Sequence, residues 1–202
     1  MYPIVAPLLP AVSLVMSPEI PDFNTELQAK DIFQFKAVEN LPSDNLSDKK
    51  LAVSPEDIPA EGERYGEIIC GTAGIDAPLY YGDTAKELKA GVGTYIGHTG
   101  AYIPGAGRTI LLAGHTNTVF RRLGELEIGD KIQINTSYGQ YEYEVNDSRV
   151  TTDTDSTAYD FTRIDENLIL YTCYPFNYLG LTNQRYFVYA EYISGPQLDL
   201  VY

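Results

Sequence analysis

Cysteine and histidine are rare in this chain of 202 residues, so each one is a candidate for chemistry. The two cysteines are Cys70 and Cys173, and the two histidines are His98 and His115. Cys173 follows the largely apolar run at 167–172 and stands just before a proline. Cys173 could be a nucleophile, a core thiol, half of a disulfide or a metal ligand. Side chains can leave the core where a strand ends, so its position allows an exposed thiol.

A zinc site made of these four side chains has little support from their spacing. Structural zinc sites bring their ligands in local pairs such as CxxC and HxxxH, and no such pair occurs here. A Cys70–Cys173 disulfide stays open, since two cysteines of a secreted domain often pair. Burial of both as free core thiols is the other alternative. For Cys70, which follows Ile68 and Ile69, the core interpretation is preferred.

His115 and Arg185 stand at strand ends in the same way as Cys173. His115 follows the run at 111–114, and Arg185 opens the strand expected after Cys173. An imidazole can take the proton of a thiol, and a guanidinium can stabilise a thiolate or the oxyanion of a tetrahedral intermediate. A lone histidine at a strand end is more often structural, and a lone arginine is usually solvated. The three together favour a cysteine nucleophile.

Strands are the main elements that must position these residues. The chain has 17 Tyr, 17 Gly and 12 Pro, a composition typical of strands joined by turns. We expect strands at 65–70, 77–81, 108–113, 131–135, 140–150, 168–173 and 185–193, with a hairpin turn at 137–139. Short helices are expected at 84–88, where Thr84 and Glu87 form a capping box, and at 117–124. The prediction is a mainly β fold, a closed eight-stranded β-barrel with short helices.

Residues 1–63 differ in composition from the rest of the chain. The stretch at 4–16 is apolar, yet it is shorter than the ~20 residues that span a bilayer, contains Pro7 and Pro10, and lacks the basic residues of a signal peptide. It is either a tail or a trimmed membrane anchor. A short amphipathic helix is expected near 24–39, and the remaining proline-dotted residues predict a linker or a segment packed on the surface. We therefore divide the chain into an N-terminal region, 1–63, and a folded domain, 64–202.

The formal net charge of −14 argues against some partners and cofactors. A field of this sign repels phosphate backbones, so nucleic-acid binding by charge is excluded. Several acidic residues gather at 151–167, namely Asp153, Asp155, Asp160, Asp165 and Glu166. Calcium needs roughly six to eight converging oxygen ligands, so we favour a solvated acidic loop over a calcium-binding loop. We expect no metal and no cofactor.

Three motifs resemble those of the sortases, the cysteine transpeptidases of Gram-positive surfaces. LILYTC at 168–173 resembles the family's TLxTC signature, with Ile169 in place of the first threonine. LAGHT at 112–116 matches the histidine motif, and Arg185 within NQRYFV matches the arginine. The resemblance extends over 65–193, and it includes GIDAPLY at 74–80 and LGELEIGD at 123–130. The continuation CYPF at 173–176 is most like class D sortases.

The resemblance implies a sortase-like barrel over a catalytic domain, 64–202, and a role for each matched residue. Cys173 would attack the scissile carbonyl of an LPxTG-like sorting signal and form a thioacyl intermediate. His115 would act as acid or base, and Arg185 would hold the substrate and its oxyanion. Thr172 and Tyr174 would bind substrate, and the alternative for Thr172 is an ordinary β-branched strand residue.

The resemblance also implies partners and a location. The partners would be surface proteins with a C-terminal sorting signal and a peptidoglycan-precursor amine, met at the extracellular face of the membrane by an enzyme anchored there in its full-length form. A cysteine hydrolase on the same scaffold and a non-catalytic extracellular β-domain that binds wall or protein partners stay open. His98, within GVGTYIGHT at 91–99, lies off the family's histidine position, which Thr94 holds here, and is expected to be a surface or structural histidine.

Overall fold

The computed structural model describes residues 51–53, 58–97, 102–176, 178 and 180–200. The apolar stretch at 4–16, the helix expected near 24–39 and His98 lie outside these residues, and the domain division at 63/64 stays a prediction. No helix in the described ranges is long and apolar enough to cross a membrane.

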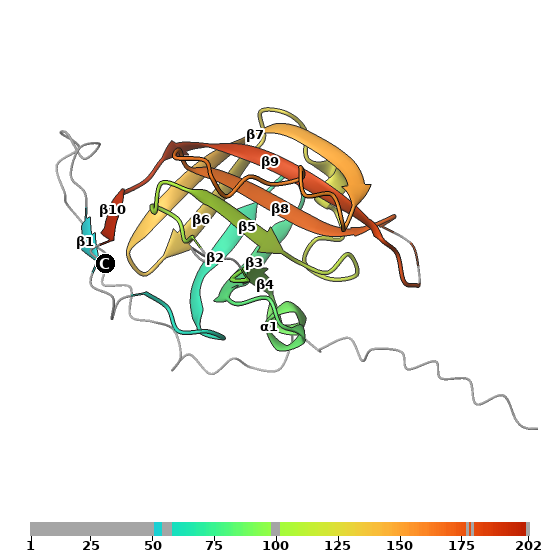
Figure 1. Ribbon diagram of the computed structural model, residues 1–202, viewed down its shortest axis with the longest axis horizontal. Coiled ribbons are helices and arrows are strands. Elements are labelled where there is room, and N and C mark those ends of the chain that lie inside the picture. Colours follow the sequence, from blue (N-terminus) through green and yellow to red (C-terminus); the bar gives the residue numbers. More distant parts are fainter. Residues whose placement is uncertain (1–50, 54–57, 98–101, 177, 179, 201–202) are drawn as a thin grey trace, which may run out of the picture. The chain divides into compact units, whose positions relative to one another are not determined.

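Among the described residues, eight strands close into a barrel, which confirms the predicted fold class (Figure 1). Their order around the barrel is β2-β3-β4-β5-β8-β9-β7-β6. Their bounds are β2 Arg64–Cys70, β3 Ile75–Tyr81, β4 Val92–Thr94, β5 Thr109–Ala113, β6 Lys131–Thr136, β7 Gly139–Thr152, β8 Asn167–Tyr174 and β9 Gln184–Ser194. A separate two-stranded sheet pairs β1, Leu51–Val53, in parallel with β10, Leu198–Leu200.

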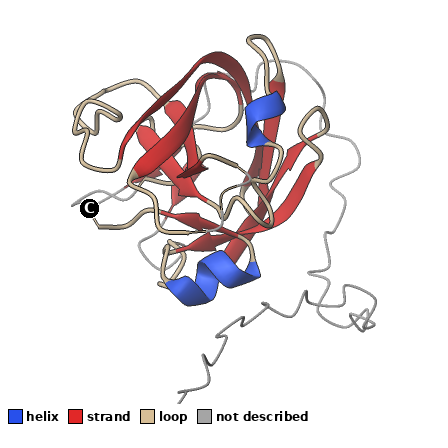
Figure 2. Ribbon diagram, turned by 90° about the vertical axis from the view of Figure 1, so that its right-hand side faces the viewer, coloured by secondary structure: helices blue, strands red, loops and turns tan. Residues whose placement is uncertain are grey.

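The helices are short and lie at the periphery of the barrel (Figure 2). Helix α1, Ala85–Ala90, begins at Thr84 as predicted. The hydroxyl of Thr84 accepts a hydrogen bond from the Lys86 amide at 3.3 Å and contacts the Glu87 carboxylate, so the cap satisfies an amide at the helix start. The helix expected at 117–124 is wrong. Residues 116–122 form turns, and only a 3-10 helix, η3 at Leu123–Glu125, follows.

Side chains of β5, β8 and β9 alternate between the inside and the outside of the barrel, because successive strand residues point to opposite faces. The inward set forms the barrel core and includes Ile110, Leu112, Leu168, Leu170, Val188 and Ala190. The outward set, Leu111, Ile169 and Phe187, forms a second cluster with Ala158. Ala158 belongs to the connection at 153–166 between β7 and β8, so this connection covers the outer face of the three strands.

Glu166, directly before β8, is a buried carboxylate that joins three parts of the barrel. It accepts hydrogen bonds from the amides of Gly105 at 3.0 Å and Gly107 at 2.9 Å, and from the hydroxyl of Tyr143 on β7 at 2.6 Å. Positive φ angles of 90° at Gly105 and 68° at Gly107 turn both amides toward the carboxylate. Burial raises the pKa of Glu166, because desolvation outweighs these hydrogen bonds. The contact fixes the starts of β5 and β8, whose other ends form the site described next.

Candidate active site

The parallel register of β5 and β8 brings His115 next to Cys173. Ala113, the last residue of β5, pairs with Tyr171. The amide of Gly114 donates to the Tyr171 carbonyl at 3.3 Å, so the chain continues alongside β8 beyond the end of β5. At this register the next residue, His115, reaches the level of Cys173.

Arg185 lies on the other side of Cys173. In the antiparallel pair of β8 and β9, Cys173 and Arg185 are direct cross-strand partners. Because paired residues point to the same face, both side chains lie on the outer face, next to Tyr171 and Phe187. The structure therefore brings together the three residues predicted to be catalytic: Cys173 and Arg185 lie on β8 and β9, and His115 lies just beyond the end of β5.

These three residues line one cavity of about 370 Å³. Most of the other lining side chains are apolar or aromatic, namely Leu88, Tyr95, Leu111, Tyr159, Tyr171 and Phe187. The rings of Tyr171 and Phe187 stack with centroids 5.6 Å apart and extend the surface beside the thiol. Cys173 is half-buried and His115 is exposed. A half-buried thiol beside an apolar surface can meet a peptide whose neighbouring side chain occupies the cavity.

Thr172 fixes the backbone between the two candidate catalytic residues. Its hydroxyl is buried and donates to the carbonyl of Gly114 at 2.6 Å. Gly114 itself has no room for a side chain, because a Cβ there would lie 2.5 Å from the ring of Phe120. Thr172 also lines the cavity, so its predicted contact with substrate stays a prediction beside this structural role.

Tyr174 is not brought into the cavity. Its ring packs against Phe176, at a centroid distance of 5.7 Å, and against Tyr186, at 6.3 Å. The strand alternation that exposes Cys173 on the outer face turns the next residue away from it. The predicted substrate role of Tyr174 remains a prediction.

Asp153 belongs to the site, although the sequence analysis identified it only as one of several acidic residues at 151–167. It lines the cavity, and its carboxylate accepts a hydrogen bond from Nη2 of Arg185 at 3.2 Å. Nη1 of the same arginine donates to the carbonyls of Thr182 at 2.8 Å and Gln184 at 2.9 Å. The guanidinium is thereby held on two sides. Asp153 is brought to Arg185 by the pairing of β7 with β9. This pairing joins segments that are distant in the sequence, so no local sequence pattern predicts the contact.

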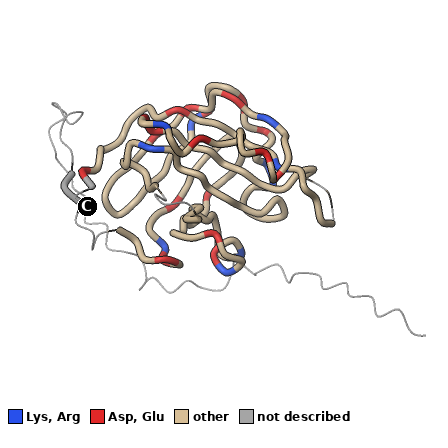
Figure 3. Tube along the Cα trace, viewed as in Figure 1, with Lys and Arg blue, Asp and Glu red and all other residues tan. Residues whose placement is uncertain are grey.

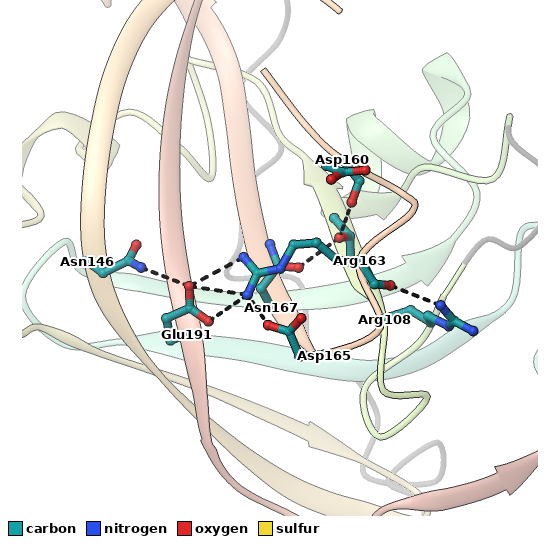
Figure 4. Close-up of polar contacts among 8 residues, drawn as sticks. Arg108, Asn146, Asp160, Arg163, Asp165, Asn167 and Glu191 are labelled. Carbon is teal, nitrogen blue, oxygen red and sulfur yellow. Dashed lines mark hydrogen bonds and ion pairs between the residues drawn. The ribbon is translucent and has the colours of Figure 1, made fainter. Parts of the chain in front are cut away.

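Arg163 holds the acidic connection at 153–166 against the barrel (Figure 4). Its guanidinium donates to Glu191 on β9 at 3.1 Å and is ion-paired with Asp165. Asn146 on β7 donates to the same Glu191 at 3.0 Å. The carbonyl of Arg163 accepts a hydrogen bond from Arg108, just before β5, at 3.1 Å. The wall of the cavity is thus tied to β5, β7 and β9.

The other carboxylates of the connection have their own donors rather than a common centre. Asp155 accepts hydrogen bonds from the hydroxyls of Thr151 and Thr157, both at 2.6 Å, and these bonds lower its pKa to about 2. Acidic and basic residues lie next to one another along the upper edge of the barrel, near β7 and β9 (Figure 3). In the described part of the chain, no three His, Cys, Asp or Glu side chains are placed to hold a metal ion.

Cys70 lies in the barrel core on β2 and is 1% exposed, which confirms the core interpretation. Cys70 and Cys173 are both free thiols, so the disulfide alternative is wrong. Cys173 is therefore available for chemistry.

The chain is similar to known proteins in sequence and in structure. The sortase domain model matches residues 70–193, which include His115, Cys173 and Arg185. Sortase D of Bacillus subtilis is 35% identical over 136 residues, which are 67% of this chain and 67% of that protein. The structure of a Clostridium perfringens sortase D5 transpeptidase is similar with a TM-score of 0.58 and 26% identity, covering 67% of this chain and 82% of that one. A Clostridium perfringens sortase C gives a TM-score of 0.60 and 26% identity, with 69% and 75% covered.

Proposed function

The chain belongs to the sortase family of cysteine transpeptidases, and on this premise we propose that Cys173 is its nucleophile, His115 its acid and base, and Arg185 the cation that stabilises the oxyanion. The observation that carries the proposal is the strand register, which places the three residues on or just beyond neighbouring strands around one cavity.

In the first half of the reaction, His115 takes the proton of the Cys173 thiol, and the sulfur attacks the scissile carbonyl of a sorting signal. The carbonyl oxygen takes the negative charge and is stabilised by N–H donors of Arg185. Collapse of the tetrahedral intermediate breaks the C–N bond, and His115 gives a proton to the leaving amine. The product is a thioester between the signal and Cys173.

In the second half, an amine of the cell wall attacks the thioester carbonyl. His115 takes a proton from this amine as the new C–N bond forms. The tetrahedral intermediate is again stabilised by Arg185, and its collapse releases the sulfur of Cys173. Because His115 is exposed, water can also reach this step, and hydrolysis is then the competing outcome.

The cavity suits an apolar residue of an LPxTG-like signal. Its aromatic and aliphatic lining offers burial to a leucine-sized side chain, at roughly 25 cal/mol per Å² of apolar surface removed from water. The scissile carbonyl, further along the signal, would then lie near Cys173 at the polar end of the cavity. We propose this signal as the donor substrate and a peptidoglycan-precursor amine as the acceptor.

Sortases act at the cell envelope, on surface proteins that carry sorting signals. We propose that this enzyme works at the extracellular face of the membrane, with 64–202 as the catalytic domain and a tail or membrane anchor within 1–63. We further propose that it needs no metal or cofactor. Supporting this, donors within the protein already engage Asp153, Asp155 and Asp165 of the acidic connection. Activity in a chelator should equal activity with added calcium.

The decisive experiment measures cleavage of a fluorogenic LPxTG peptide with and without a triglycine acceptor. Mass spectrometry of a quenched reaction should find the acyl group on Cys173, and the transpeptidation product should replace the free acid when the acceptor is added. Cys173→Ala should abolish both the adduct and turnover. Cys70→Ala is the matched control, since it removes the buried thiol of β2 and should leave turnover intact. Turnover by Cys173→Ala would exclude Cys173 as the nucleophile.

A further inference from the structure

Asp153 extends the row of candidate catalytic residues to a fourth strand. Strand β7 pairs with β9 on the side away from β8, and Thr151 and Thr152 lie opposite Arg185 and Gln184. The next residue, Asp153, donates its backbone amide to the carbonyl of Asn183 at 2.8 Å. Four neighbouring chain segments therefore carry a histidine, a cysteine, an arginine and an aspartate in order across one edge of the barrel.

Asp153 and Arg185 form an ion pair inside the cavity. Asp153 is the only acid, and Arg185 the only arginine or lysine, among the described residues that line the cavity. The Arg185 side chain is 21% exposed and the Asp153 side chain is 39% exposed, so the guanidinium is shielded by the cavity while the carboxylate remains open to water. A charge-assisted hydrogen bond of this kind fixes the direction of a guanidinium as well as contributing energy.

The contacts of Arg185 leave a defined set of donors unused. A guanidinium has five N–H groups. Nη1 donates to two backbone carbonyls and Nη2 donates to Asp153. Within the ranges that the structure describes, the Nε–H and the second Nη2 hydrogen have no protein acceptor. With respect to the described residues, these two donors are available for the oxygen of a substrate carbonyl.

We propose that Asp153 is a positioning residue that orients Arg185, so that its unused donors meet the oxyanion as charge develops there. The proposal rests on the role assigned to Arg185 in the proposed function. Asp153 does not touch the reacting atoms. Its effect should appear in the chemical step rather than in binding, because donors aimed at the oxyanion act mainly in the transition state.

The kinetic test compares Asp153→Asn, Asp153→Glu and Glu144→Gln. Asp153→Asn keeps the size of the side chain and removes its charge, and it should lower kcat about tenfold with KM changed less than about twofold, as expected for loss of one charge-assisted hydrogen bond that orients a transition-state donor. Asp153→Glu keeps the charge and should recover much of the loss. Glu144→Gln is the matched control, since it removes an acid of β7 that pairs with Lys131 outside the cavity, and its kcat should equal that of the wild type.

A second measurement keeps the test independent of turnover. The guanidinium NMR signals of Arg185, assigned with an Arg185→Lys variant, should show restrained rotation in the wild type and faster rotation in Asp153→Asn. Unchanged rotation, an unchanged kcat or an effect on KM alone would each overturn the positioning role. A wild type without turnover would refute the proposed function, while the NMR comparison would still decide whether Asp153 restrains Arg185.

Discussion

Thr172→Val is the sharpest test of how the fold joins the two reacting side chains. Valine has nearly the same shape as threonine and suits a strand, so the change removes one hydroxyl and little else. That hydroxyl donates to the carbonyl of Gly114 at 2.6 Å in a buried place. Gly114 directly precedes His115, and Thr172 directly precedes Cys173. The variant therefore cuts the side-chain link between the two segments.

The expected magnitude follows from burial. Thr172 is 2% exposed, so water cannot replace the lost donor, and the Gly114 carbonyl loses a partner. Leaving a buried acceptor without its donor costs about 1–3 kcal/mol of the free energy of unfolding. For a domain of this size that corresponds to a fall in Tm of roughly 3–10 °C. We expect kcat to fall as well, because the segment that carries His115 loses one of its restraints.

Urea unfolding followed by far-UV circular dichroism measures the first effect, since the chain has no tryptophan to report by fluorescence. Peptide cleavage measures the second. Thr172→Ser is the control, because it keeps the hydroxyl and should retain most of the stability and activity. A Thr172→Val variant as stable and as active as Thr172→Ser would refute the assigned role of this hydrogen bond.

Three further changes test the surroundings of the site. Gly114→Ala should lower the free energy of unfolding by about 1–3 kcal/mol in urea titrations, because its Cβ would meet the ring of Phe120; a Gly114→Ala/Phe120→Leu double variant should regain part of the loss, and wild-type stability of the single variant would contradict the packing argument. Glu166→Gln tests the buried carboxylate: burial raises the pKa of Glu166 in the folded state, so its contribution is fully present at acid pH and is lost as pH rises through that pKa. The stability of the wild type relative to the variant should therefore shrink as pH rises above the ordinary pKa of a glutamate, and a constant difference would speak against the raised pKa. Asp155→Asn should act in the opposite direction, because the pKa of Asp155 is lowered from 3.8 to about 2; in thermal unfolding the variant should be less stable at neutral pH and approach the wild type as pH falls through about 2, and equal stability at neutral pH would show that the hydrogen bonds of Asp155 contribute nothing.

The residues placed around the cavity were accessible to sequence reasoning because their signals are local. Each of His115, Cys173 and Arg185 stands at the end or the start of a strand, and a change from apolar alternation to polar residues marks such a place along the chain. The barrel itself followed from the number of strand-like runs. The capping of α1 by Thr84 was also readable, because a cap and its partner lie within one turn.

The parts that escaped sequence reasoning depend on contacts between distant segments. From the sequence, Glu166 was predicted to be one of several solvated charges in an acidic loop. In the structure its carboxylate is buried and accepts hydrogen bonds from glycine amides about sixty positions earlier in the chain. Asp153 acquires a partner only because β7 pairs with β9 across a separation that no local pattern reports. Strand β4 has three residues, too few to show alternation. The helix expected at 117–124 does not form. The amides of Thr118 and Phe120 both donate to the carbonyl of His115, and Phe120 is buried, so this segment folds into turns.

His115 and Cys173 reach the same level because each lies the same number of residues after a paired position on two parallel strands. Thr109 pairs with Asn167, and from there His115 is six positions on (109 to 115), as Cys173 is (167 to 173). Parallel neighbours rise by about 3.3 Å per residue, so equal counts bring the two residues to the same level. Glu166 sets the common start and Thr172 secures the common end. A shift of one residue in β8 would turn the Cys173 side chain toward the core and the Thr172 side chain toward the outer face, because the two faces of a strand alternate. The barrel therefore contributes to the site chiefly by fixing the register of β5 and β8.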